Sequence, residues 1–250
     1  EGGSTFFHNM TQVIDGHTGI EHSIPIPQVY EDVVKLWGNT KVGYTPTLIV
    51  AYGGIWGENY WYDKTNVWEN KKLLTFTPRA IIDERSRRRV KAPEEEYGHL
   101  QNTKACSQIA KAGTKVNLGA HGQLQGLGVH WELWMLQQGG MTNLEALRCG
   151  TQNGADYIGM GDALGSLSVG KLADLVILDK NPLENIQNSE AIRYVMKNGR
   201  LYDATTMNEI GNYDKKRPKF FWEDGKSSLN FEWHEDTHSF EHGKCSCGAH

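Results

Sequence analysis

The feature that most constrains the fold is a threefold alternation of short apolar runs with helix-like segments before residue 160. The runs at 18–23, 42–52 and 115–122 predict strands, and the second has the apolar, β-branched composition of a strand buried on both faces. The predicted helices are 8–16, 27–40, 94–113, 128–140 and 142–159. This order is typical of an α/β fold with parallel strands and crossover helices. Because three strands cannot close a barrel, the pattern is that of part of a larger structure.

Three further parts of the chain differ in character from this pattern. Residues 53–93 form a long insertion rich in Trp, Tyr, Asn and charge, predicted as a lid or binding loop with local helix. Residues 161–206 read as a small β unit, in which Asn198-Gly199 is a strong hairpin signal. Residues 207–250 form a polar tail rich in His and Cys. The expected organisation is therefore 1–160, 161–206 and 207–250, with the insertion inside the first part.

Composition and charge restrict the classes of partner. The net charge of −4 does not suit nucleic-acid binding, and the basic run 85–89 is followed at once by the acidic run 94–96. No stretch approaches the ~18 consecutive apolar residues of a membrane helix. We therefore expect neither a nucleic acid nor a membrane as partner. Cys106 and Cys149 lie in helix-like contexts and are expected to be small core residues.

The polar tail carries a candidate metal site of its own. Cys245 and Cys247 are spaced as Cys-x-Cys, with His242 and His250 close by, and thiolates and imidazoles are ligands for zinc or copper. The alternatives are a disordered terminus or a pair of cysteines prone to disulfide formation. The site would be structural or scavenging.

Several segments resemble the amidohydrolase superfamily. The most specific is "GSLSVGKLADLVILD" at 165–179, which follows a helix at 144–160 and precedes the hairpin at 192–203. "TGIEHS" at 18–23 is similar to the sixth barrel strand of that superfamily and "KVNLGAHG" at 115–122 to the eighth. The closest subgroups are the imidazolonepropionase-like and prolidase-like metal-dependent hydrolases. The implied fold is the C-terminal portion, about strands six to eight, of a TIM-like (β/α)8 barrel, with the C-terminal strands of a small β-sandwich.

The resemblance also implies a metal site at the mouth of the barrel. His22 corresponds to the histidine of strand six, a metal ligand in the family, although outside that context the ordinary interpretation is a loop histidine bonded to a backbone carbonyl. His121 stands where the family usually has an aspartate that contacts metal and accepts a proton from water. It is expected to ligate metal or to act as the catalytic base, since a neutral imidazole can serve in either role.

The rest of that site is not in this sequence. No His-x-His pair precedes residue 18, and segments like strands four and five are absent, so the missing barrel half is an expected partner, either in the same protein or as a separate chain. The implied cofactor is a divalent metal, zinc first, with Mn or Fe as alternatives. The implied substrate is a small amide or peptide-like molecule. Candidate substrate contacts are His8, His130, Tyr52 and Trp56, although capping or packing explains His130 equally well, and an ordinary aromatic cluster explains the two insertion residues.

The resemblance implies hydrolysis of amide-type C–N bonds by metal-activated water, with this segment inactive when alone. Two alternatives remain open. One is a non-catalytic metal-binding or assembly protein, and the other is a hydrolase that lost its chemistry with the change to His121. A homo-oligomer is also left open. Long relatives that carry a β-propeller favour a periplasmic or secreted location.

Overall fold

The computed structural model describes residues 2–26, 28–87 and 89–224 of the chain. The chain divides into two compact units. Of the described residues, the first unit contains 2–26, 28–66 and 89–217, and the second contains 67–87 and 218–224. None of the helices in the described ranges is long and apolar enough to span a membrane.

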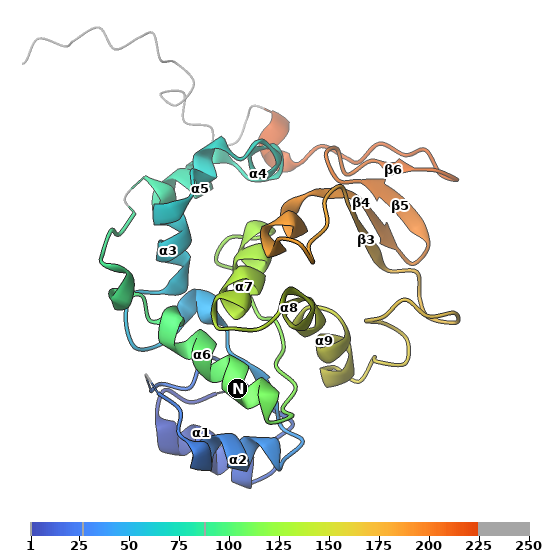
Figure 1. The fold of residues 1–250 in the computed structure, drawn as a ribbon. Coiled ribbons are helices and arrows are strands. Elements are labelled where there is room, and N and C mark those ends of the chain that lie inside the picture. The colour runs from blue at the N-terminus through green and yellow to red at the C-terminus, as the bar shows by residue number, and fades with distance from the viewer. Residues whose placement is uncertain (1, 27, 88, 225–250) are drawn as a thin grey trace, which may run out of the picture. The chain divides into compact units, whose positions relative to one another are not determined.

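The part of the first unit before residue 160 combines the helices seen in Figure 1 with short parallel strands. β1 (Gly19–Glu21) pairs in parallel with β2 (Gly43–Thr45), so that Ile20 lies opposite Tyr44. Tyr44 also bridges Val116 in parallel, which brings the third predicted run beside the second. The predicted parallel order of these three segments is therefore confirmed.

Helices pack around these strands. α1 (Phe6–Ile14) contacts β1, and α2 (Glu31–Gly38) packs beside α6 (His99–Lys111). Trp37 of α2 meets the ring of Tyr44 edge-on at 5.0 Å between centroids, and both side chains are fully buried. Burial of these two aromatic side chains anchors the strand to the helix layer.

The second strand is much shorter than predicted. The run 42–52 leaves the sheet after Thr45, turns at Thr47 with a left-handed φ of 50°, and continues as the 3-10 helix η1 (Leu48–Val50). The buried carboxylate of Glu132 accepts the first two N–H groups of η1, which a strand would have used in the sheet. Apolar, β-branched composition could not reveal this, because the competing acceptor lies far away in the sequence.

Two other predicted elements also need correction. Residues 115–122 contribute only an isolated bridge at Val116 and form no regular strand. The single helix predicted over 142–159 is two helices, α8 (Asn143–Cys149) and α9 (Gln152–Tyr157). The helix breaks because Thr151 adopts φ −131° and ψ −97°, which is outside the helical region.

The predicted helix signals at the start of α8 are confirmed. Thr142 accepts the N–H of Glu145, and Glu145 in turn accepts the N–H of Thr142, so the capping box is complete. The Thr142 N–H and the Thr142 hydroxyl both donate to the Glu145 carboxylate, and these two bonds lower its pKa.

The insertion contains local helix, as predicted, and part of it is core. α3 (Gly57–Lys64) belongs to the first unit and places Tyr60, Trp61 and Tyr62 in the interior. Trp61 and Tyr62 pack against tryptophans of α7 (Leu127–Gln138), at centroid distances of 5.0 and 5.2 Å. These three aromatic residues therefore form a hydrophobic cluster and not a wall over an open pocket. The 3-10 helix η3 (Glu94–Glu96) follows the insertion.

The second unit is built from short helices. They are η2 (Val67–Glu69), α4 (Lys71–Phe76), α5 (Arg79–Ser86) and η5 (Phe221–Asp224). Phe220 packs edge-on against Phe76 at 6.4 Å and stacks on Trp222 at 4.5 Å. These ring contacts connect the two stretches of sequence that make up the unit.

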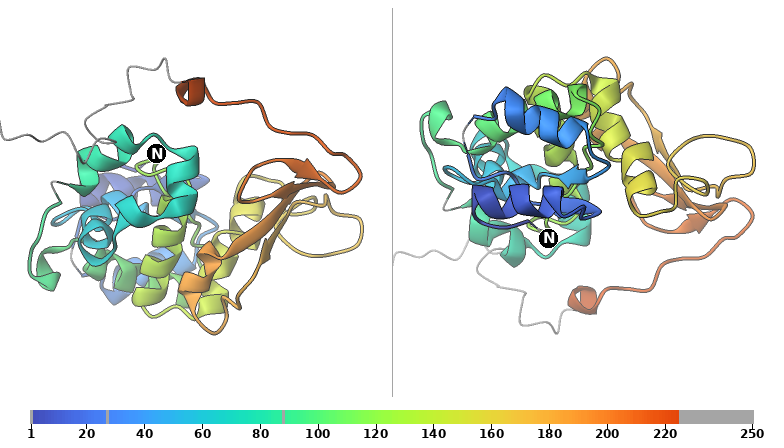
Figure 2. Two further views of the ribbon diagram at one scale, coloured as in Figure 1. Left: turned by 90° about the horizontal axis from the view of Figure 1, so that it is seen from above. Right: turned by 90° about the horizontal axis from the view of Figure 1, so that it is seen from below.

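An antiparallel sheet follows α9 (Figure 2). Its strands, in spatial order, are β3 (Leu175–Leu178), β4 (Ile192–Lys197), β5 (Arg200–Asp203) and β6 (Glu209–Ile210), and the 3-10 helix η4 (Ile186–Glu190) precedes β4. The predicted hairpin is confirmed, because Asn198 and Gly199 both adopt positive φ, 49° and 78°, between β4 and β5. β6 was not expected, since its sequence lies in the polar tail.

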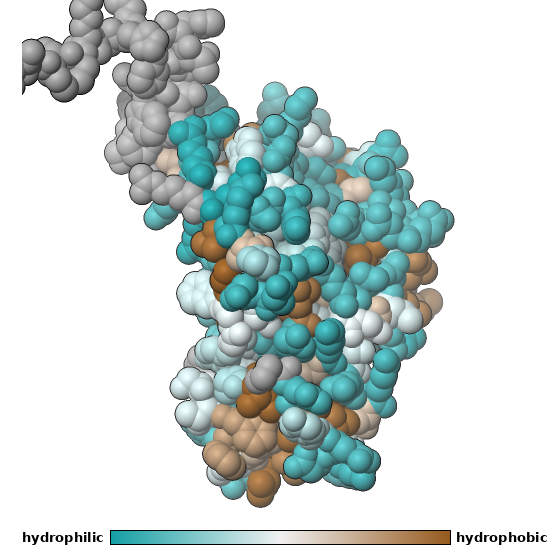
Figure 3. All heavy atoms as spheres, turned by 60° about the vertical axis from the view of Figure 1, so that its left-hand side comes forward, coloured by the Kyte–Doolittle hydropathy of each residue, from teal (hydrophilic) through white to brown (hydrophobic). Residues whose placement is uncertain are grey.

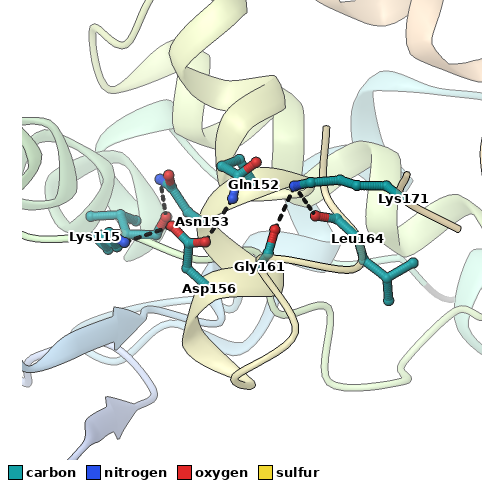
Figure 4. Close-up of polar contacts among 8 residues, drawn as sticks. Lys115, Gln152, Asn153, Asp156, Gly161, Leu164 and Lys171 are labelled. Carbon is teal, nitrogen blue, oxygen red and sulfur yellow. Dashed lines mark hydrogen bonds and ion pairs between the residues drawn. The ribbon is translucent and has the colours of Figure 1, made fainter. Parts of the chain in front are cut away.

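The polar residues of the most specific sequence motif have structural partners. Lys171 donates hydrogen bonds to the carbonyl oxygens of Gly161 and Leu164, as Figure 4 shows. Asp174 accepts the N–H of Asn198 at 2.6 Å and pairs with Lys197, and both contacts lower the pKa of its carboxyl. The motif thus holds the entry to β3 and the hairpin turn in place.

Candidate active site

The structure places the two main candidate histidines side by side. The rings of His22 and His121 meet edge-on, with 5.2 Å between their centroids. His22 follows β1 directly, and His121 follows the bridge at Val116 by five positions. Both therefore lie beyond the carboxyl ends of parallel segments, where α/β folds commonly carry their sites.

The turn that carries His22 is fixed by hydrogen bonds to distant parts of the chain. His22 has a left-handed φ of 69°, a conformation that costs a non-glycine residue roughly 1 kcal/mol. Ser23 accepts the N–H of Tyr52 at 2.9 Å, and the N–H of Ile24 donates to the Tyr44 hydroxyl at 3.0 Å. Burial raises the pKa of Tyr44 well above its ordinary value, so this hydroxyl stays neutral. The tertiary contacts offset the cost of the turn.

His121 is exposed and is oriented by a local contact. Its φ is 52°, and its Nδ1 lies 2.7 Å from the Gln123 side-chain oxygen. In the neutral tautomer that donates Nδ1–H to this oxygen, Nε2 is the nitrogen with the lone pair. Gly119 lies so close to Thr45 that a Cβ would come within 2.5 Å of its methyl carbon, so only glycine fits there. The contact with Gln123 and the close packing at Gly119 therefore fix the local surroundings of His121.

Two aromatic candidates lie in the loop that follows β2. The ring of Tyr52 is 6.3 Å from that of His22, so the structure brings it to the histidine pair. The side chain of Trp56 is 47% exposed, and no contact places it against the pair. Their role as substrate contacts stays a prediction.

His8 and His130 lie elsewhere. His8 is exposed on α1 and covers Gly3, whose ideal Cβ would be 2.2 Å from the His8 Nδ1. His130 Nδ1 is 3.0 Å from the Ser189 hydroxyl, which also accepts the Trp134 indole N–H at 3.1 Å. This contact between α7 and η4 supports the packing interpretation of His130. The four tail candidates, His242, Cys245, Cys247 and His250, lie outside the described residues.

The donor set is suitable for zinc in kind and incomplete in number. Two neighbouring imidazoles are typical zinc ligands, but catalytic zinc generally has three protein ligands. Within residues 2–26, 28–87 and 89–224, no group of three or more His, Cys, Asp or Glu side chains is placed to hold a metal ion. A metal held by His22 and His121 would need a further donor from outside these ranges.

One buried carboxylate near the site was missed by sequence reasoning. Glu132 is fully buried on α7, and its two oxygens accept the N–H groups of Leu48 at 2.7 Å and Ile49 at 3.0 Å. Burial raises its pKa to about 8, against the lowering effect of those two bonds. The available signal was a lone acid in the apolar helical stretch "VHWELWML".

Comparison with known proteins gives consistent matches over much of the chain. Residues 99–202 match the amidohydrolase family. Ochratoxinase from Aspergillus niger is 30% identical over 177 residues, which cover 64% of this chain and 36% of that protein. The chain thus spans little more than a third of this curated relative.

Solved structures show the same relationship. A Xaa-Pro dipeptidase with bound methionine aligns with a TM-score of 0.53 and 24% identity, over 78% of this chain and 42% of the other. A prolidase complexed with N-methylphosphonate-L-proline aligns with a TM-score of 0.54 and 25% identity, over 80% and 43%. The mixed α/β structure described above accordingly matches part of the amidohydrolase barrel family. The family match over residues 99–202 and these relatives together support a relationship of this chain to the amidohydrolase superfamily.

Proposed function

We propose that this chain is part of a hydrolase that cleaves amide-type C–N bonds in small amide or peptide-like substrates. The observation that carries the proposal is the juxtaposition of His22 and His121 beyond the ends of the parallel segments. Ochratoxinase, the dipeptidase and the prolidase are hydrolases by name and share this fold. Their names support the reaction class proposed for this chain.

The parallel part of the first unit is proposed to be strands six to eight of an eight-stranded barrel. Its support is the parallel order of β1, β2 and the Val116 bridge, together with an alignment to less than half of each solved relative described above. The sheet β3–β6 would then belong to the small β-sandwich that accompanies the barrel. In this proposal, the other barrel strands and the further metal donors come from outside the described residues.

His22 and His121 would hold a divalent metal, with zinc first and Mn or Fe as alternatives. Such a metal, when bound, lowers the pKa of a water molecule toward neutrality. In the tautomer that donates Nδ1–H to Gln123, Nε2 of His121 would either bind metal or accept a proton. It cannot do both at once, and the two roles are distinguished by the metal content of His121→Gln.

The substrate would bind beside the histidine pair. Tyr52 is the aromatic side chain that the structure places next to His22, and it is proposed to contact the substrate. Trp56 and His8 remain candidates for that role in the complete protein. Xaa-Pro dipeptides and N-acyl amino acids are suitable first substrates, because the names of the relatives contain a dipeptide and a proline phosphonate.

The test compares two histidines at opposite ends of β1 in the natural polypeptide that contains this sequence. His22→Ala is expected to lower the affinity for zinc at least tenfold. Loss of a residue that only supports a metal ligand already costs about tenfold or more in metal affinity, and loss of a ligand should cost at least as much. His22→Ala should also abolish hydrolysis of a panel of Xaa-Pro dipeptides. His17→Ala is the matched control, since His17 is exposed at the entry to the strand. Unchanged zinc content and turnover in His22→Ala would show that the assignment is wrong.

The rival function is metal binding or assembly without catalysis. It is favoured by the lack of a third donor among the described residues. Zinc retention that depends on His22, with no hydrolysis in the presence of Zn, Mn or Fe, would support this rival or a hydrolase that has lost its chemistry.

A further inference from the structure

We infer that Glu132 is a positioning residue of the proposed site, because its buried carboxylate fixes the loop that lies between the turns of His22 and His121. The loop in question is 47–52, which follows β2. β2 pairs with β1 on one side and bridges Val116 on the other, so its loop emerges between the two histidine-bearing turns. The inference rests on the proposed function, since it assigns Glu132 a role toward the same site.

The carboxylate satisfies backbone groups that η1 leaves without partners. The first N–H groups of a helix have no acceptor within it. Leu48 and Ile49 instead donate to separate oxygens of Glu132, at 2.7 and 3.0 Å. Glu132 lies on α7, so this pair of bonds fixes the start of the loop against a helix far away in the sequence.

The start of the loop packs closely against the segment that carries His121. Thr47 has a left-handed φ of 50°, and its hydroxyl donates to the Thr45 carbonyl at 3.3 Å. An ideal Cβ on Gly119 would lie 3.3 Å from the Thr47 hydroxyl oxygen and 2.5 Å from the Thr45 methyl carbon. Displacement of Thr47 would therefore change the packing around Gly119, two residues before His121.

The end of the loop meets the turn that carries His22. The N–H of Tyr52 donates to the Ser23 hydroxyl at 2.9 Å, and the Tyr52 carbonyl accepts from the Asn102 side chain at 2.7 Å. The Tyr52 ring lies 6.3 Å from that of His22. The same loop therefore contacts the surroundings of both histidines, and Glu132 holds the end that Ser23 and Asn102 do not hold.

Glu132 cannot itself be the group that touches the substrate. Its side chain is fully buried, and each of its oxygens already accepts a backbone N–H. The remaining alternative is a purely structural role in the stability of α7, which the experiment has to separate from positioning.

The experiment measures metal binding in the natural polypeptide carrying Glu132→Gln. Glutamine keeps the volume but offers one acceptor oxygen and one NH2 donor, so one of the two N–H groups loses its partner. We expect about tenfold weaker Zn²⁺ binding in competition with a chelator, the scale of loss seen when support of metal ligands is removed. We also expect an altered visible spectrum of bound Co²⁺, which reports ligand geometry independently of turnover.

Leu133→Ala is the matched control. Leu133 is the neighbouring buried residue on α7, and its truncation should cost stability without removing either acceptor of the loop. Its Co²⁺ spectrum should equal that of the wild type. Should Glu132→Gln fail to fold, Ser23→Ala removes the anchor at the other end of the loop and is expected to change the Co²⁺ spectrum similarly.

The outcomes separate this inference from the proposed function. If the wild type binds zinc through His22, and the Glu132→Gln or Ser23→Ala variant that folds shows wild-type Zn²⁺ affinity and Co²⁺ spectrum, the positioning role is wrong. The same holds if Leu133→Ala changes them as much. If the wild type itself binds no zinc, the proposed function fails first.

Discussion

Buried ionisable residues give this protein a pH dependence that can be assigned to single side chains. Glu132 has a pKa of about 8 in the folded state against an ordinary value of 4.5, because burial disfavours its charged form. Because the folded-state pKa is raised, the stability that Glu132 contributes is fully present below about pH 4.5 and is lost as the pH rises through about 8. At roughly 1.4 kcal/mol per pKa unit, the loss has a ceiling of roughly 5 kcal/mol.

We therefore predict that the wild type loses stability between pH 5 and 8 relative to Glu132→Gln. Glutamine has no proton to release, so its free energy of unfolding should be flatter over this window. Urea unfolding at several pH values measures the difference. Parallel curves for the two proteins would mean that Glu132 is not ionising in the folded state.

His99 should produce the opposite slope. It is fully buried at the start of α6 between the rings of Tyr60 and Tyr97, and burial lowers its pKa to about 4. Because the folded-state pKa is lowered, the stability that neutral His99 contributes is present above the ordinary pKa of 6.5 and is lost as the pH falls through about 4. His99→Gln should remove up to about 3 kcal/mol of this acid sensitivity. Titration of the His99 ring by NMR checks it, and a midpoint near 6.5 would refute the prediction.

At the scale of elements, Tyr157 of α9 packs against β1 and β2, while Asn153 and Asp156 of the same helix contact Val116 and Lys115. Glycines at 19 and 43 leave space on neighbouring strands, and an ideal Cβ on Gly43 would lie 2.6 Å from the Tyr157 ring. The Tyr157 hydroxyl donates to the carboxylate of Glu21 at 2.5 Å. Because Gly19 and Gly43 pair with each other and have no side chains, the Tyr157 ring can lie against the sheet at this point.

We predict that Gly43→Ala lowers the free energy of unfolding by about 1–3 kcal/mol, the usual cost of overpacking. Gly154→Ala is the control on α9 itself, where a Cβ makes only an ordinary 3.5 Å contact. It should stabilise the protein by about 0.5–1 kcal/mol. A double-mutant cycle of Gly43→Ala with Tyr157→Ala should show coupling. Additive effects would mean that the ring is not what the methyl group meets.

The elements that sequence predicted well are those governed by local chemistry. The capping box at Thr142 and the turn at Asn198-Gly199 depend on neighbouring residues, and both are confirmed. The short β2 depends on Glu132, which lies more than eighty positions later, and no local pattern contains that contact. β6 pairs with β5 although its sequence is polar, because backbone hydrogen bonds form the pairing.

The candidate site divides in the same way. His22 and His121 were predicted from a resemblance to a family, and the structure places them together. Glu132 was missed because its significance lies in which N–H groups it accepts, which needs the tertiary structure. The packing of His130 on Ser189 likewise depends on η4 lying against α7.

At the scale of the whole molecule, α1 carries two large exposed apolar side chains. Phe7 is 80% exposed and Ile14 is 70% exposed, and their spacing of seven puts them on one face. Tyr30, just before α2, is also exposed. On the face drawn in Figure 3, one group of hydrophobic side chains lies at the lower end, at the height where Figure 1 shows α1 and α2.

We predict that this apolar face promotes self-association of the 250-residue polypeptide, because exposed apolar patches lower their free energy by burial. For the wild type, the mass measured by light scattering should increase with protein concentration. For the double variant Phe7→Ser, Ile14→Asn, it should stay close to the monomer mass over the same concentrations. Leu144→Gln is the control, since Leu144 is a solitary exposed apolar side chain on α8. Retention of the associated species in the double variant would locate the contact elsewhere, and loss of association in Leu144→Gln would show that general surface hydrophobicity is the cause.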